Sequence, residues 1–316
     1  MATESNGPVS PRNESRGEEI MRVGYVGLGN MGGALARRLQ LAVPLHVYDL
    51  SQAAMAGLAA TGATACKSAR EVAEKSDIVL TCLQTSRQVR EVIFGPDGIA
   101  EGLAEGGIIV DQTTGDAFET RAMNRELAEH GLHFIDAPVS GGPPGAAAGT
   151  IAIMVGAPPD LFARVEPVLA AISGNVFHTG DIGTGHVMKV ANNLMAAAQR
   201  LLTHEVMCLA TKSGVEPATA IQVLQRSSGR NYTVDVTYPR HILTGHLFQG
   251  FTLALMHKDV TLANDLAAKA GVPLFFGSQV KEHYQAAINE FGAEGDVNDA
   301  VRMFERLAMT RVRPDA

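Results

Sequence analysis

The sequence predicts an α/β fold in its first half, with a doubly wound and mostly parallel sheet, followed by an all-α C-terminal domain that begins with a long helix. Two observations predict this class. Short β-rich runs alternate with helical patterns up to about residue 155, and beyond residue 185 the apolar residues recur at helical spacing only. Such alternation is typical of βαβ units with a parallel sheet, whereas continuous helical periodicity is typical of a helical domain.

Each expected element follows from its local pattern. We expect strands at residues 22–26, 45–48, 78–82, 107–111, 133–136 and 150–155, which are rich in β-branched and other apolar residues. Helical spacing predicts helices at residues 31–41 and 52–61 in the first half, and at about 185–212, 217–225, 253–270, 273–292 and 297–307 in the second. The helix that ends near Lys212 is so apolar that we expect it to be buried at a domain or subunit interface.

The composition excludes several classes of function. The formal net charge of −7 gives no support for binding to nucleic acid. Cys66, Cys82 and Cys208 lie far apart in apolar surroundings, which favours reduced thiols in a cytoplasmic protein over disulfides or a metal site. The sequence contains no apolar stretch long enough to span a membrane. Residues 1–20 are polar, and we expect them to form a disordered extension rather than a targeting signal.

The first expected strand runs directly into a glycine-rich turn that has the pattern G-x-G-x-x-G. Its residues are Gly27, Leu28, Gly29, Asn30, Met31 and Gly32. Between a strand and a helix, these glycines permit a tight turn, close approach of a pyrophosphate and close packing of the helix on the strand. Asp49 ends the second strand, where a carboxylate accepts hydrogen bonds from a ribose diol and repels a 2′-phosphate. The pattern predicts a Rossmann domain that binds NAD in preference to NADP.

Lys189 stands near the start of the long helix, and Asn193 follows four residues later, so the two side chains project from one face. An amine beside an amide is sufficient for acid/base chemistry on an alcohol or a carbonyl. We expect His186 to face solvent or cap the turn, and the histidine spacing predicts no metal site. The expected domains are therefore a Rossmann domain at residues 21–182 and an all-α domain at residues 183–316, with Lys189 on its first helix.

With these motifs the chain resembles the β-hydroxyacid dehydrogenases, the family that contains 3-hydroxyisobutyrate dehydrogenase, tartronate semialdehyde reductase and L-threonate dehydrogenase. The similarity runs from about Met21 to Arg306. It comprises four motifs in order: the glycine-rich turn, residues 136–142 with the glycines that follow, residues 183–193 and residues 251–260. The resemblance implies that Lys189 is the catalytic residue and that Asn193 holds the substrate.

The resemblance also assigns the residues around this pair. Ser140, Gly141 and Gly142 are implied to bind the substrate carboxylate, which agrees with the ability of consecutive N–H groups to hold an anion. The residues implied to lie along the cofactor are Leu83, Gln84, Thr114 and Lys258. Gln84 and Gln112 stand where many members have proline and methionine, and neither change removes a catalytic group.

The implied reaction is reversible hydride transfer between nicotinamide and the alcohol carbon of a small β-hydroxy acid, or reduction of the matching semialdehyde. Lys189 would accept the hydroxyl proton in oxidation and donate a proton in reduction. A helix start, an apolar cleft and Lys258 nearby disfavour the ammonium form of Lys189, whereas a bound carboxylate opposes them. Arg230 is expected to enter the substrate pocket, and the polar Asn231 and Tyr232 after it favour a hydroxylated acid.

Three alternatives remain at the level of the sequence. A 6-phosphogluconate dehydrogenase shares the lysine motif, but this chain is short and has no evident basic cluster for a phosphate. An imine reductase shares the turn and the long helix, but usually lacks the lysine. A non-catalytic NAD-binding module would keep the fold, but it predicts substitution of Lys189 and Asn193, which are both present. By resemblance we also expect a homodimer or homotetramer in the cytoplasm.

Overall fold

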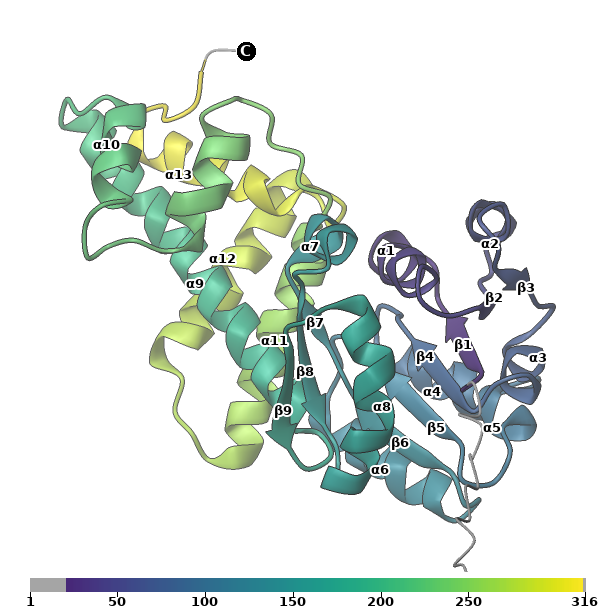
Figure 1. The fold of residues 1–316 in the computed structure, drawn as a ribbon. Coiled ribbons are helices and arrows are strands. Elements are labelled where there is room, and N and C mark those ends of the chain that lie inside the picture. The colour runs from purple at the N-terminus through teal and green to yellow at the C-terminus, as the bar shows by residue number, and fades with distance from the viewer. Residues whose placement is uncertain (1–20, 315–316) are drawn as a thin grey trace, which may run out of the picture.

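A nine-stranded sheet forms the centre of the first half (Figure 1). The computed structural model describes residues 21–314, so the extension expected at residues 1–20 lies outside the described residues. The strands are β1 (Val23–Val26), β2 (Leu45–Tyr48), β3 (Thr64–Ala65), β4 (Ile78–Thr81), β5 (Ile108–Asp111), β6 (His133–Asp136), β7 (Val139–Ser140), β8 (Ala152–Gly156) and β9 (Val176–Gly180). Strands β1 to β6 are parallel in the order 3-2-1-4-5-6, which is that of a doubly wound dinucleotide fold.

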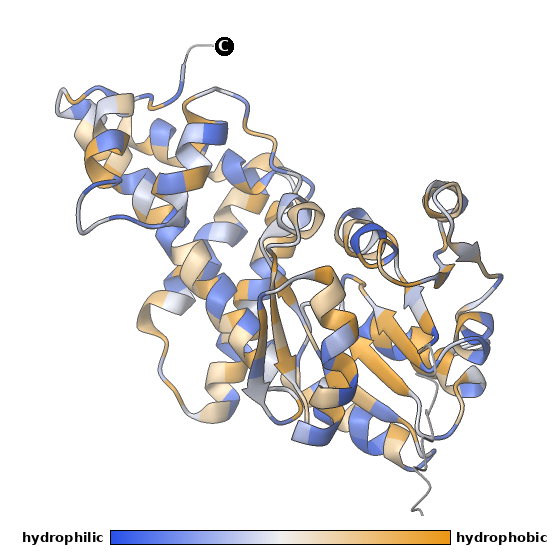
Figure 2. Cartoon of the chain, viewed as in Figure 1, coloured by the Kyte–Doolittle hydropathy of each residue, from blue (hydrophilic) through white to orange (hydrophobic). Residues whose placement is uncertain are grey.

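Beyond β6 the sheet is no longer purely parallel. Strand β8 pairs antiparallel with β6 and β7, and β9 runs parallel to β8. The sheet is therefore mostly parallel, as the sequence predicts. Parallel strands covered on both faces need apolar residues on both faces, and every residue of β1, β4 and β5 is buried. Of these strands, β4 and β5 are predominantly orange in the hydropathy view (Figure 2).

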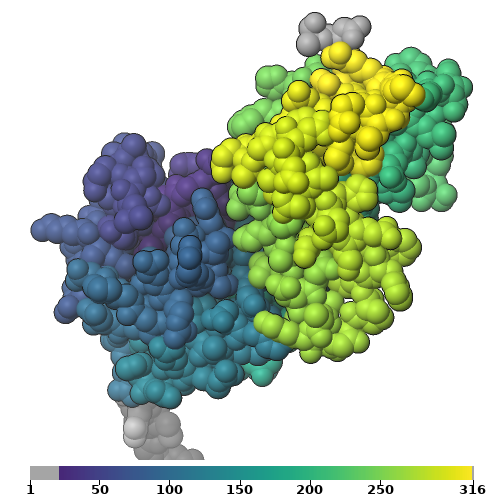
Figure 3. Space-filling view, turned by 180° about the vertical axis from the view of Figure 1, so that it is seen from behind, coloured from purple at the N-terminus to yellow at the C-terminus, as the bar shows by residue number. Residues whose placement is uncertain are grey.

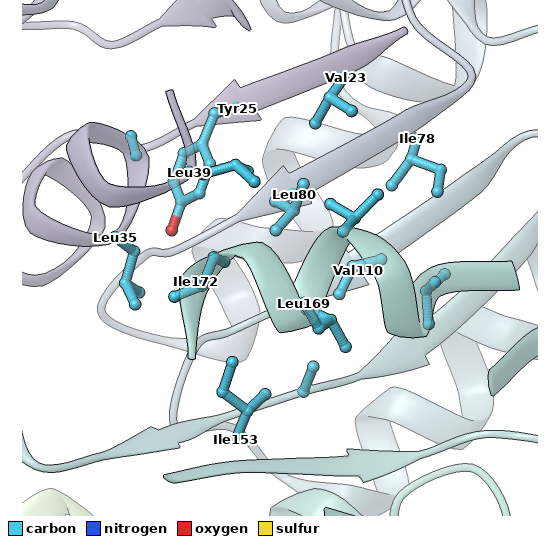
Figure 4. Close-up of a cluster of buried hydrophobic side chains, with 14 of the residues drawn as sticks. Val23, Tyr25, Leu35, Leu39, Ile78, Leu80, Val110, Ile153, Leu169 and Ile172 are labelled. Carbon is cyan, nitrogen blue, oxygen red and sulfur yellow. The ribbon is translucent and has the colours of Figure 1, made fainter. Parts of the chain in front are cut away.

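Helices cover both faces of this sheet. They are α1 (Asn30–Leu39), α2 (Gln52–Ala59), α3 (Ala69–Glu74), α4 (Ser86–Phe94), α5 (Ile99–Gly102), α6 (Ala117–Ala128), α7 (Gly142–Ala148) and α8 (Pro159–Ile172). On one face, Tyr25 and Leu80 of the sheet pack with Leu35 of α1 and Leu169 of α8 (Figure 4). On the other face, a second apolar cluster joins the sheet to α3, α4, α5 and α6. This two-sided burial explains why the sheet is doubly wound.

Within the described residues, the regular elements of the second half are all helices. They are α9 (Thr184–Lys212), α10 (Pro217–Leu224), the π-helix η1 (Thr233–Ile242), α11 (Leu253–Ala270), α12 (Phe275–Phe291), the 3₁₀-helix η2 (Val297–Asp299) and α13 (Ala300–Ala308). A third apolar cluster lies entirely within this half. Seen from behind, the yellow-green helical lobe and the purple-blue sheet lobe are separated by a hollow at the top (Figure 3). This distribution of cores supports the proposed domain boundary near residue 183.

Three strands, the π-helix and the helices α3 to α8 are not among the elements expected from the sequence. Strands β3 and β7 have two residues each, which is too short for a periodic pattern. Strand β9 is partly exposed and contains a histidine and a threonine. The π-helix Thr233–Ile242 includes Pro239, a residue that predicts a break in an α-helix. Among the described residues, no helix meets the length and hydropathy needed to cross a membrane.

The packing of α1 on the glycine-rich turn generates a stability prediction. A Cβ at Gly32 would overlap the carbonyl oxygen of Gly27, whereas a Cβ at Gly29 would meet no heavy atom within 4 Å. We expect Gly32→Ala to lower the free energy of unfolding by about 1–3 kcal/mol, and Gly29→Ala to leave it nearly unchanged. Urea denaturation followed by circular dichroism checks both variants. Equal stability of the two variants would contradict this account of the packing.

Candidate active site

The glycine-rich turn between β1 and α1 has room for a ligand beside its backbone. Gly27 has a φ of +91°, which lies in the left-handed region that favours glycine. Gly29 is the N-cap of α1 and carries no side chain that could cap the first N–H groups of the helix. Because the space next to Gly29 is open, an anion can approach the positive end of α1. The turn therefore fits the pyrophosphate of a dinucleotide.

Asp49 lies beside this turn, just after the end of β2. Its carboxylate accepts hydrogen bonds from the backbone N–H of Leu28 at 2.6 Å and of Ser51 at 2.7 Å. Leu28 is buried, Asn30 is exposed and Met31 is half-buried. These bonds fix the carboxylate next to the turn, at the place where doubly wound folds bind the ribose of a dinucleotide.

The start of α9 is held by a carboxylate from the sheet. Asp136, the last residue of β6, is fully buried and accepts hydrogen bonds from the N–H of Gly183 at 2.6 Å and of His186 at 2.7 Å. The N-cap of α9, Gly183, provides no side-chain cap of its own. Asp136 thus satisfies N–H groups at the positive end of the helix. This contact fixes where α9 begins, and with it the position of Lys189.

The expectation that His186 faces solvent or caps the turn is wrong. Its side chain is completely buried. One ring nitrogen, Nδ1, lies 2.7 Å from Oγ1 of Thr120, and the other, Nε2, lies 2.8 Å from the carbonyl oxygen of Thr113. These partners are 66 and 73 residues away in sequence, so local spacing could not reveal them.

The amine of Lys189 is buried in the same region, with only 8 % of the residue exposed. Its Nζ donates a hydrogen bond to Oδ1 of Asn193 at 3.0 Å. Burial lowers the pKa of Lys189 to about 8, and the positive charge of Lys258 acts in the same direction. The carboxylate of Asp259 opposes both effects. The direction agrees with the expectation from the sequence, and it makes Lys189 able to gain or lose a proton near neutral pH.

Lys189 and Asn193 are connected to the predicted carboxylate-binding segment through Asn192. The Asn192 amide donates to Oδ1 of Asn193 at 3.0 Å and to Oγ of Ser140 at 3.2 Å. Ser140 ends β7, and the two glycines after it have φ values of +139° and +66°. Successive glycine N–H groups in such a turn form a concave site for an anion. The structure therefore brings the predicted segment Ser140–Gly142 next to the predicted catalytic pair.

On its other side, Asn193 is connected through Asp259 and Lys258 to the residues expected to line the cofactor. The amide Nδ2 of Asn193 donates to Oδ2 of Asp259 at 2.6 Å, and Oδ1 of Asp259 pairs with Nζ of Lys258 at 3.0 Å. Lys258 also donates to the carbonyl oxygens of Gln84 and Thr114, each at 2.9 Å. The polar chain is thus continuous from Ser140 to Thr114, and it passes through two helices of the second half.

Comparison with known proteins decides the family. The model of the NAD-binding domain of 6-phosphogluconate dehydrogenase matches residues 22–180, and the model described as NAD-binding of NADP-dependent 3-hydroxyisobutyrate dehydrogenase matches residues 183–304. The chain is 33% identical to 2-(hydroxymethyl)glutarate dehydrogenase of Eubacterium barkeri, over 92% of this chain and 97% of that protein. It belongs to the β-hydroxyacid dehydrogenase family.

Further relatives are similar to this chain over most of their length. The 3-hydroxyisobutyrate dehydrogenase of Pseudomonas aeruginosa is 35% identical, over 80% of this chain and 88% of that protein. The solved structure of Mycobacterium tuberculosis 3-hydroxyisobutyrate dehydrogenase with L-serine superposes with a TM-score of 0.81 at 29% identity, covering 90% of this chain and 99% of that one. The similarity therefore spans both halves of this β-hydroxyacid dehydrogenase.

Apart from Lys258, the residues expected to line the cofactor lie in two segments, Leu83–Gln84 and Thr113–Thr114, which together are called the cofactor wall. The N–H of Leu83 donates to Oγ1 of Thr113 at 3.0 Å, which ties the segment after β4 to the segment after β5. Both segments follow the carboxyl ends of parallel strands, the edge at which doubly wound sheets bind their ligands. The residues expected to line the cofactor therefore form one continuous wall in the structure.

Arg230 is the predicted site residue that the structure does not bring to this network. Its side chain is 66% exposed, and its guanidinium pairs with Asp235 of the π-helix at 2.8 Å. The next residue, Asn231, donates to Thr203 of α9. Thr203 comes fourteen residues after Lys189 on this helix, a separation of about 21 Å at the usual helical rise. Within one chain, Arg230 and the expected polar wall of Asn231 and Tyr232 thus give no support for a hydroxylated substrate.

Three further residues of the site are not among those predicted from the sequence. Asp136 and Asp259 are buried carboxylates at the two ends of the site, and Asn192 bridges the catalytic pair to Ser140. Each is adjacent to a predicted residue in sequence or belongs to a quoted motif, but its role depends on a partner from another element. Among residues 21–314 there is no group of three or more His, Cys, Asp or Glu side chains that could hold a metal ion.

Proposed function

We propose that this protein is an NAD-dependent dehydrogenase that interconverts a small β-hydroxy acid and the matching semialdehyde. The observation that carries the proposal is the buried amine of Lys189, placed in one polar chain between the carboxylate-binding turn and the cofactor wall. A bound nicotinamide would accept the hydride in oxidation and supply it in reduction. The membership of the family supports the same reaction.

Lys189 is the proposed proton carrier. In oxidation its neutral amine takes the proton of the substrate hydroxyl, and in reduction its ammonium form gives a proton to the carbonyl oxygen. Asn193 is the proposed holder of the reacting oxygen, because its Nδ2 has a second N–H besides the one that bonds Asp259. Ser140 accepts a hydrogen bond from Asn192, which leaves its hydroxyl proton for the substrate carboxylate.

The lowered pKa of Lys189 fixes the direction of the pH dependence. The neutral amine accumulates as the pH rises through about 8, so we expect oxidation to become faster over that range. Reduction needs the ammonium form and is expected to slow over the same range. Lys189→Met should reduce kcat by about 10²–10⁴-fold in both directions and remove the titration near pH 8. Nicotinamide absorbance with a panel of hydroxy acids measures the rates.

A control and an opposing outcome complete this test. Lys67 is an exposed lysine far from the network, so Lys67→Met should keep the rate and the pH profile of the parent protein. Equal turnover by the parent and by Lys189→Met would contradict the mechanism. Absence of turnover by the parent with every β-hydroxy acid would favour a non-catalytic NAD-binding module.

NAD is the proposed cofactor, with NADP less favoured. The support is the carboxylate of Asp49, which is fixed at the end of β2 and would repel a 2′-phosphate. The matching family models name both NAD and NADP, so they support the dinucleotide without separating the two.

Asp49→Ser tests this choice of cofactor. We expect the KM for NAD to rise about tenfold, the cost of a typical charge-assisted hydrogen bond, while the KM for NADP falls or stays the same. Asp160→Ser changes an exposed aspartate on α8 and should leave both values unchanged. A parent enzyme that prefers NADP, or an unchanged cofactor ratio in Asp49→Ser, would overturn the proposal.

We also propose that the protein is a homo-oligomer, a dimer or a tetramer, that acts in the cytoplasm. Met188, Met195, Leu202 and Leu209 recur every seven residues on α9 and are 47–69 % exposed. A heptad stripe of this length is typical of a helix that packs on another helix. The cytoplasmic location is supported by the three cysteines, which are free thiols.

Light scattering tests the oligomer. We expect the parent protein to have at least twice the mass of one chain, and Leu202→Glu to shift the population toward the monomer because a charge would enter the apolar contact. Glu205→Gln, on the same exposed side of α9, is the control and should keep the mass of the parent. A monomeric parent protein would remove the proposal.

A further inference from the structure

Two basic side chains of the second half bind adjacent carbonyl groups of the cofactor wall. Lys258 on α11 donates to the Thr114 carbonyl oxygen at 2.9 Å, and Nε2 of His186 on α9 lies 2.8 Å from the Thr113 carbonyl oxygen. A carbonyl oxygen only accepts, so this nitrogen of His186 carries a proton and donates. His186 therefore does for Thr113 what Lys258 does for Thr114.

Thr113 connects the two segments of the cofactor wall. Its N–H donates to Oδ1 of Asp111 at 3.0 Å, and its Oγ1 accepts from the N–H of Leu83 at 3.0 Å. These two bonds belong to the sheet half. The contact from His186 is the bond that connects Thr113 to the helix that carries Lys189.

The ring of His186 is fixed on every side by other elements. The ring nitrogen Nδ1 lies 2.7 Å from Oγ1 of Thr120 on α6. The backbone N–H of His186 donates to Oδ2 of Asp136 on β6 at 2.7 Å. A Cβ at Gly115 would lie 3.0 Å from Cε1 of the ring, so the wall packs directly against the imidazole. The facing charged groups are the carboxylates of Asp111 at 3.8 Å and Asp136 at 4.0 Å. A side chain held in this way has one orientation.

We propose that His186 is a positioning residue that sets the distance between the cofactor wall and Lys189. This inference rests on the proposed function. His186 precedes Lys189 by three residues, so the two side chains lie about one helical turn apart on neighbouring parts of one face. Loss of the bond to Thr113 frees the wall to move relative to the amine. A misplacement of about 1 Å between reacting groups is enough to lower a rate about 10²-fold.

Two substitutions of His186 distinguish the loss of its hydrogen bond to Thr113 from the loss of its volume in the packing. His186→Leu fills a similar volume without a donor, and His186→Gln provides an amide N–H. We expect His186→Leu to lower kcat at least tenfold with less than a threefold change in the KM for NAD, because the damage is to hydride transfer rather than to binding. His186→Gln should recover kcat to within about threefold of the parent. The substrate is whichever of 3-hydroxyisobutyrate, L-serine and L-threonate has the highest turnover.

The deuterium isotope effect on kcat, with that acid deuterated at its alcohol carbon, distinguishes positioning from general destabilisation. We expect a larger isotope effect in His186→Leu than in the parent, since hydride transfer becomes slower than the other steps. The matched control is His204→Leu, which removes another fully buried histidine of α9, bonded to Tyr238 in the helical core. It should change the melting temperature and leave the isotope effect unchanged.

Two results would show that His186 does not position the cofactor wall. A folded His186→Leu protein with the parent kcat and isotope effect would overturn the inference, as would losses of kcat that simply follow the melting temperature in both histidine variants. If His186→Leu does not fold, Thr120→Val removes the bond to Nδ1, together with the bond from the Thr120 hydroxyl to the Asp116 carbonyl oxygen, and must show the same larger isotope effect. Absence of hydride transfer in the parent protein would refute the proposed function instead, and it is seen before any variant is compared.

Discussion

Burial of one amine is the constraint on which the site depends. An ammonium group removed from water is unstable unless other groups compensate for the lost hydration, and burial is the main reason that the pKa of Lys189 is low. The surrounding residues limit this effect without cancelling it. Asp259 supplies a negative charge, but that charge is shared with Lys258, and Asn193 stands between Asp259 and Lys189. The result is a lysine whose pKa is lowered to about 8.

The sheet topology determines which residues can surround this amine. In the parallel part of the sheet, β4, β5 and β6 all end at one edge, where Leu83 and Thr113 follow β4 and β5 and where Asp136 is the last residue of β6. Helix α9 begins at this edge because Asp136 binds its first N–H groups. The second half adds Lys258 from α11, which crosses to the same edge. The site is therefore formed by contacts between the two halves, and neither half contains all of it.

The sequence predicted six strands, α1, α2 and the α-helices of the second half, but not the helices α3 to α8 of the first half. The strands of apolar residues and the helices Leu253–Ala270 and Thr184–Lys212 were located within one or two residues, and the glycine-rich turn stood between the expected strand and helix. The strands β3 and β7 were missed because two residues carry no period. His186 and Asp136 were missed for a different reason. The local sequence around His186 gives no sign of burial. The residues that bury it and bond its ring, Thr113 and Thr120, belong to other elements.

The position of Asn193 can be understood from the chemistry of its amide. The oxygen of this amide faces the donors of Lys189 and Asn192, and its nitrogen faces the carboxylate of Asp259. A carboxylate in its place would put two anionic oxygens against each other, and an apolar side chain would remove the bonds that Asn193 makes to Nζ of Lys189 and to Oδ2 of Asp259. Among uncharged side chains of this length, the amide of asparagine has a donor at one end and an acceptor at the other. Asn193 therefore connects the buried lysine to the buried aspartate through one amide, and the amine keeps its capacity to exchange a proton.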